Sequence, residues 1–175
     1  MVTEIISGRA RNSEDLDFIL DLAFELFKEP NGCKTKSEYR KIISPWLNDL
    51  SLGMVIAYAD DVLVGFCLHR LIPDNEFSFY ISAARSRRVS YYNNSRVIEM
   101  VVIVPHYRRM GIGRSLVAKV MEDSAPATSQ IYATCWKGKD GDSYPLFMSL
   151  NFQELTTVHS CYYDNSSGIV VVKKL

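Results

Sequence analysis

The residues best suited to chemistry follow an apolar run in the middle of the chain. Val97–Val104 is apolar except for Glu99, Pro105 ends the run, and the six residues RRMGIG then occupy positions 108–113. This order predicts a buried strand, a tight turn, and a helix whose N-terminus opens on the turn. The first N–H groups of a helix have no partner within it, and the helix dipole is positive there. The segment is therefore suited to binding a phosphate group.

Spacing excludes two common phosphate-binding turns. A P-loop, Gly-x-x-x-x-Gly-Lys-Ser/Thr, ending at Gly113 would need glycine at position 108, where the chain has Arg108. A dinucleotide-binding turn, Gly-x-Gly-x-x-Gly, would need a third glycine at position 116, where the chain has Leu116. The turn therefore belongs to neither class.

The whole string resembles Arg/Gln-x-x-Gly-x-Gly/Ala, the acetyl-coenzyme A-binding motif of the GNAT superfamily of N-acetyltransferases. Arg108, Gly111 and Gly113 stand at the defined positions of that motif. The expected order of helices and strands is also similar to that of the family over almost the entire chain. The resemblance implies an enzyme that transfers an acetyl group from acetyl-CoA directly to a primary amine, on a small molecule or on a protein.

The resemblance also implies which residues hold the cofactor. Glycine lets a pyrophosphate approach the backbone closely, because no Cβ intervenes. Successive N–H groups from Arg109 to Ser115 can form an anion-binding nest, with arginines adding charge at its rim. In the family the central strand separates from its neighbour, and its backbone binds the pantetheine arm. The implied cofactor-binding residues are Val101, Val102, Ile103, Arg108, Arg109, Met110, Gly111, Ile112, Gly113, Arg114 and Ser115.

Glu99 is the candidate general base. Acetyl transfer needs a neutral nitrogen, whereas an alkyl ammonium group has a pKa of about 10. Glu99 is the only charged residue in the apolar run, and strict alternation gives it the same strand face as Val97, Val101 and Ile103. Partial burial would raise the pKa of Glu99 toward a useful value. The alternative is that Glu99 is bound to Arg96 or to a backbone amide.

A general acid is needed to protonate the thiolate that leaves. At the position of the family's usual acid, this chain differs from the family pattern. Family members often end with Asn-x-x-Ala-x-x-Leu-Tyr-x-Lys-x-Gly-Phe, and alignment on Phe152 puts Phe147 at the tyrosine and Asp140 at the asparagine. Phenylalanine cannot donate a proton. Tyr144, about one helical turn earlier, is the nearest phenol, unless it is only a packing residue. The alternatives are that the thiolate leaves toward solvent, or that the chain is a non-catalytic acyl-CoA-binding module of the same fold.

Periodicity predicts the elements that position these residues. Their order, β-α-α-β-β-β-α-β-α-β-β, predicts an α/β fold of the α+β type in which helices flank a mixed, mostly antiparallel sheet, in a single domain over residues 1–175. The expected strands cover residues 2–6, 54–59, 62–68, 97–104, 130–136, 152–159 and 168–173. The expected helices cover 13–29, 35–50 and 143–150, and a further one runs from the glycine turn to Ser124. Thr35 and Glu38 form a capping-box pattern at the start of the second helix.

The segment Pro73–Arg96 is irregular and interleaves arginines with tyrosines. Such a segment can grip an anionic substrate or RNA. The alternative is a solvated loop or an extended hairpin. Because a long excursion within a compact domain often serves function, we regard this segment as a candidate substrate loop.

Composition narrows the class of partner. The 20 basic and 20 acidic residues give a net charge of zero, which favours neither nucleic acid nor an anionic membrane as the main partner. No apolar run approaches the roughly 18 residues that span a bilayer, and the start of the chain lacks the apolar core of a signal peptide. The 4 cysteines are scattered, so we expect reduced thiols, no metal site and a cytoplasmic protein. A homodimer formed through exposed strands is an open alternative to a monomer.

Overall fold

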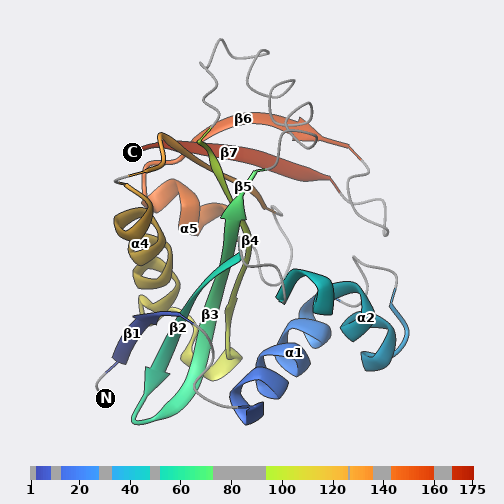
Figure 1. Cartoon of the computed structure of the whole chain (residues 1–175). Coiled ribbons are helices and arrows are strands. Elements are labelled where there is room, and N and C mark those ends of the chain that lie inside the picture. The colour runs from blue at the N-terminus through green and yellow to red at the C-terminus, as the bar shows by residue number, and fades with distance from the viewer. Residues whose placement is uncertain are drawn as a thin grey trace.

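The computed structural model describes residues 3–8, 13–27, 33–47, 52–72, 94–125, 127–135, 143–159 and 167–175. Most of the candidate substrate loop, and Asp140, lie outside the described residues. In the described part, a sheet of seven strands runs in the order β1-β2-β3-β4-β5-β7-β6 (Figure 1). Its strands are β1 (Thr3–Ser7), β2 (Leu52–Ala59), β3 (Val62–Leu71), β4 (Arg96–Ile103), β5 (Gln130–Cys135), β6 (Gln153–Val158) and β7 (Gly168–Lys174).

Helices cover both faces of the sheet. Figure 1 shows α1 (Ser13–Phe27) and α2 (Lys36–Leu47) on one side, and α4 (Ile112–Ser124) and α5 (Tyr144–Ser149) on the other. A short 3₁₀ helix, η1 (Pro105–Tyr107), follows β4. Neighbouring strands are antiparallel except β4 and β5, which are parallel. The predicted mixed, mostly antiparallel sheet and the predicted order of elements are confirmed, although β3 continues to Leu71 rather than ending at Leu68.

Alternation along the strands divides the core between the two faces. On the α4 face, Cys67 of β3 packs with Leu116 and Val120 of α4. On the α1 face, Phe66 of β3 and other apolar strand residues pack against the two N-terminal helices. Residues two apart on a strand share a face, so one strand supplies both cores.

Polar contacts join α1 to α2 and cap the start of α2. Arg40 pairs with Asp17 across the two helices at 2.8 Å. The predicted capping box is confirmed, because the Glu38 N–H donates to Thr35 Oγ1 at 3.2 Å and the Thr35 N–H donates to Glu38 Oε2 at 3.1 Å. The Glu38 carboxylate accepts hydrogen bonds from the backbone N–H groups of Lys34 and, with a smaller effect, Thr35, and these bonds lower the pKa of Glu38.

None of the described helices is both long and apolar enough to cross a membrane.

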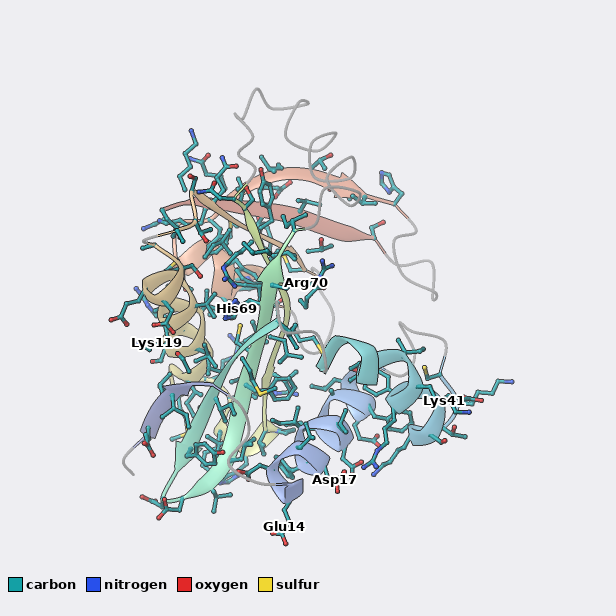
Figure 2. The ribbon with its side chains drawn as sticks, in the orientation of Figure 1. Glu14, Asp17, Lys41, His69, Arg70 and Lys119 are labelled. Carbon is teal, nitrogen blue, oxygen red and sulfur yellow. The ribbon has the colours of Figure 1, made fainter. Side chains whose placement is uncertain are left out.

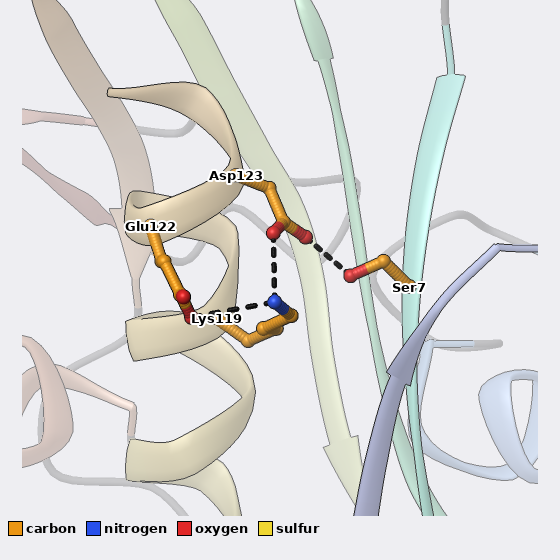
Figure 3. Close-up of polar contacts among 4 residues, drawn as sticks. All are labelled: Ser7, Lys119, Glu122 and Asp123. Atoms are coloured by element: carbon orange, nitrogen blue, oxygen red, sulfur yellow. Dashed lines mark hydrogen bonds and ion pairs between the residues drawn. The ribbon is translucent and has the colours of Figure 1, made fainter. Parts of the chain in front are cut away.

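A group of polar contacts lies in the C-terminal half of α4. Lys119 pairs with Asp123 at 2.9 Å and with Glu122 at 3.3 Å (Figure 3). The Ser7 hydroxyl on β1 donates to the Asp123 carboxylate, so the same acid joins the helix to the edge strand.

His69 of β3 is a buried histidine near Asp123. A Cβ at Gly53 would lie 2.2 Å from its ring, so the close approach of β2 requires glycine at that position. Arg96 donates to His69 Nδ1 at 2.9 Å, and because a guanidinium can only donate, Nδ1 is the unprotonated nitrogen. Burial, and then the charge of Arg96, lower the pKa of His69 to about 4.

This histidine makes stability depend on pH. Between its ordinary pKa of 6.5 and about 4, the unfolded chain binds a proton that the folded chain excludes. The free energy of unfolding should therefore fall as pH is lowered through this window, by up to about 1.4 kcal/mol per pH unit, and level off below it. Denaturant unfolding at several pH values should show this slope, and the slope should shrink in a His69→Gln variant. A His159→Gln variant, altered at an exposed histidine, is the control; equal slopes in both variants would contradict the assignment.

Candidate active site

The turn between η1 and α4 has the backbone shape of an anion nest. Arg109 has φ 64° and Gly111 has φ 84°, both in the left-handed region, and Gly111 is the N-cap of α4. A Cβ at Gly111 would meet nothing within 4 Å, so the space beside the turn is open. The first residues of α4 direct unpaired N–H groups toward this end of the helix. The conformation, the open space and the helix dipole together fit a pyrophosphate.

The donors of this nest are fewer than the sequence predicted. The Ser115 N–H donates to the Gly111 carbonyl at 3.0 Å, so it is already used inside the helix. This N–H group is therefore not a free donor of the nest, because the fourth residue of a helix closes its first hydrogen bond. The Arg108 N–H likewise donates to the Pro105 carbonyl at 3.2 Å. The nest is therefore limited to residues 109–114.

Some side chains around the turn are bonded or buried, and others are exposed to solvent. Arg108 is partly buried, and its Nε donates to the Ile103 carbonyl at 3.2 Å, which ties the turn to the end of β4. Arg109 and Arg114 are exposed on either side of Gly111 in the sequence, so their contribution to phosphate binding stays a prediction. Met110 is 54% exposed, whereas Ile112 is buried in the α4 core.

The strands β4 and β5 separate close to this turn. Their parallel pairing joins Arg96 to Ile131, Val97 to Tyr132 and Ile98 to Ala133, and stops there. The predicted separation of the central strand from its neighbour is thus present.

The stretch of β4 beyond this pairing carries three of the predicted cofactor residues. Val101, Val102 and Ile103 lie there, and their side chains pack into the two cores. A Cβ at Gly113 would lie 3.4 Å from Leu146 and 3.8 Å from Ile103, so α4, α5 and the end of β4 meet beside the turn.

Glu99 does not share a face with Val101 and Ile103, contrary to the prediction from alternation. The register of β3 and β4 shifts between Leu68 and His69, which pair with Met100 and Ile98, so Glu99 is the extra residue of a β-bulge. Val101 and Ile103 pack against the α4 core, whereas Glu99 bonds to a residue on the α1 face.

Glu99 is bonded to Arg70, which the sequence did not suggest. Arg70 Nε donates to Glu99 Oε1 at 2.7 Å, and each side chain is only 16% exposed. Arg96, one of the predicted partners, instead bonds to His69. Arg70 was missed because the expected strand stopped at Leu68. Continuing the period-two pattern by one step would have placed Arg70 on the same face as Leu68.

The position that often holds tyrosine in the family belongs to the core here. Phe147 is 2% exposed and packs edge-on against Phe152 at 5.0 Å between ring centroids. Tyr144, at the start of α5, donates its hydroxyl proton to Glu154 Oε2 of β6 at 2.8 Å. This hydrogen bond, followed by burial, raises the pKa of Tyr144 and makes the phenol a weaker acid. Among the described residues, no group of three or more His, Cys, Asp or Glu side chains can hold a metal ion.

Comparisons with known proteins agree with this geometry. The ribosomal-protein-alanine N-acetyltransferase of Brucella melitensis shares the fold with a TM-score of 0.70 and 17% identity, over 97% of this chain and 99% of that one. NAA60 of Arabidopsis thaliana, solved in complex with a bisubstrate analogue, has a TM-score of 0.71 and 15% identity, over 98% of this chain and 99% of that one. The PaiA N-acetyltransferase of Thermoplasma acidophilum, solved in complex with coenzyme A, has a TM-score of 0.62 and 17% identity, over 100% of both chains.

At these identities the likeness concerns the fold alone. No curated protein matches the chain in sequence. The model of the acetyltransferase (GNAT) family, however, matches residues 17–152, well over half of the chain. The chain therefore belongs to the GNAT family of acetyltransferases, which transfer an acetyl group from acetyl-CoA to an amine.

Proposed function

We propose that the chain acts as a single catalytic domain that transfers the acetyl group of acetyl-CoA directly to a primary amine, on a small molecule or a protein. The observation that carries the proposal is the course of β4. This strand separates from β5 after Ile98, carries Glu99 at the next position, and ends at Ile103, from which η1 leads to the glycine turn. One strand thus connects the anion-binding turn to the only charged side chain between Val97 and Val104.

Acetyl-CoA would lie along this strand. Backbone N–H groups of residues 109–114 would bind its pyrophosphate, with Arg109 and Arg114 adding charge at the rim. The backbone edge of Val101, Val102 and Ile103 would hold the pantetheine arm in the separation between the strands. When bound, acetyl-CoA supplies an activated acyl group as a thioester.

Glu99 would take the proton from the acceptor amine. It lies on the α1 face of the sheet, so the acceptor would approach from the side of α1 and α2. Tyr144 packs against the core of the opposite face, on the side of α5. To protonate the departing thiolate, Tyr144 would have to exchange its hydrogen bond to Glu154, and its raised pKa favours release of the thiolate toward solvent instead.

We further propose a cytoplasmic protein that uses no metal and no nucleic acid. Cys33, Cys67 and Cys135 are free and buried in the part of the chain that the structure describes, which suits a reducing compartment. Whether it works as a monomer or as a homodimer formed through exposed strands is decided by its mass in solution.

The function is tested by release of coenzyme A thiol across a panel of primary amines, with calorimetry for acetyl-CoA in parallel. We expect binding of acetyl-CoA, and thiol release that depends on at least one amine, with one acetyl group appearing on the amine for each thiol released. Binding without release above the rate in buffer, for every amine, would instead show a non-catalytic acyl-CoA-binding module.

A Gly111→Glu variant should lose acetyl-CoA binding. Its side chain would enter the open space at a φ of 84°, and its charge would meet the pyrophosphate. We expect a Kd at least about 100-fold higher, because like charges at contact distance repel by several kcal/mol where water is partly excluded. The Gly111→Gln variant is the control: its side chain has a similar size and causes the same backbone strain, but it carries no charge. It should weaken acetyl-CoA binding less than Gly111→Glu does. Unchanged affinity in folded Gly111→Glu protein would show that the turn does not hold the cofactor.

A Glu99→Gln variant should lower kcat with little change in acetyl-CoA affinity. Glutamine keeps the shape of the side chain but cannot accept a proton, and loss of a general base typically costs about 100-fold or more in rate. Steady-state kinetics with the best amine of the panel measure this loss. If kcat and its pH dependence match the wild type, Glu99 is not the base.

A further inference from the structure

Arg70 and Glu99 form a partly buried ion pair where β4 leaves β5. Glu99 follows Ile98, the last β4 residue paired with β5, and its carboxylate accepts a 2.7 Å hydrogen bond from Arg70. We propose that Arg70 is a positioning residue for acetyl transfer, which holds the Glu99 carboxylate beside the separation of the strands, where the acceptor amine has to lose its proton. The inference rests on the proposed role of Glu99 as the base.

Two separate features of the sheet bring these side chains together. Arg70 lies two residues beyond Leu68 and therefore on its face, toward α1 and α2. Figure 2 shows His69 and Arg70 directed to opposite sides of β3. The bulge at Glu99 then turns this carboxylate to the face of Arg70, where strict alternation would have turned it toward α4.

The chemistry of arginine suits this task. A guanidinium is planar and always charged, and its Nε–H direction is set by the stem, so a bond from Nε fixes the direction of the carboxylate. A carboxylate can accept about four hydrogen bonds, and the bond to Arg70 does not exhaust that capacity. Without Arg70, the partly buried carboxylate would lose the charge of this partner and the direction that the Nε bond gives it.

A second arginine pair in the chain provides a matched control. Arg40 and Asp17 meet at 2.8 Å, nearly the separation of Arg70 and Glu99, but their side chains are 45% and 62% exposed. An exposed pair of this kind contributes little to stability. Arg40→Gln therefore removes the same chemical group from a pair that does not include Glu99.

The test is a double-mutant cycle of Arg70→Gln and Glu99→Gln, measured with the amine that the wild type acetylates best. We expect Arg70→Gln to lower kcat about 10- to 100-fold, as a displaced catalytic group does, with the calorimetric Kd for coenzyme A unchanged. In the Glu99→Gln background, the same change should cause no further loss, because Arg70 acts through Glu99. Arg70→Lys should recover part of the rate, and Arg40→Gln should keep the wild-type rate.

Each other outcome is decisive. An equal loss in both backgrounds, or a wild-type rate for Arg70→Gln, overturns the inference and leaves the role of Glu99 intact. A wild-type rate for Glu99→Gln contradicts the proposed base and, with it, the positioning role. If the wild type acetylates no amine, crystal structures of wild type and Arg70→Gln decide: a rotated Glu99 carboxylate supports the inference, and an unmoved one overturns it. Thermal unfolding verifies that each variant is folded.

Discussion

The site depends on one pairing, the short parallel contact between β4 and β5. Antiparallel neighbours can be joined by a short turn, but parallel neighbours require a crossover that returns the chain to the same end of the sheet. Here that crossover is η1, the glycine turn and α4. The crossover begins where β4 ends, so η1 and the glycine turn bring the N-terminus of α4 close to the end of the strand that separates from its partner. A requirement of chain connection thus places the anion nest beside the open edge.

The same pairing stops after three residues, and the β-bulge follows at once. A bulge increases local twist and bends its strand, which accounts physically for β4 turning away from β5 at this point. It also places the one charged side chain of the apolar run on the face opposite α4. The separation of the strands and the orientation of Glu99 are in this way two results of one extra residue in β4.

Placing charges near this point has a structural cost that the surrounding residues offset. Glu99 and Arg70 are both mostly buried, and each compensates the charge of the other. On the opposite face, Arg96 is bonded to a neutral His69 that is packed against Gly53. Asp123, joined to Lys119 and to Ser7 of β1, lies near this histidine and links the end of α4 to the sheet. The helix that carries the nest is therefore anchored at its far end by polar contacts and along its length by the core.

The sequence by itself determined the features that depend on neighbours along the chain. Hydrophobic periodicity predicted the order of the elements, the Thr35–Glu38 pattern predicted the cap of α2, and the spacing of Gly111 and Gly113 predicted the phosphate-binding turn and the family. The tertiary structure alone decided which face Glu99 occupies, that Arg70 is bonded to it, and that Tyr144 donates to Glu154. The physical reason is that a bulge and its register arise from pairing between strands distant in sequence, and a single inserted residue reverses every face that local alternation predicts.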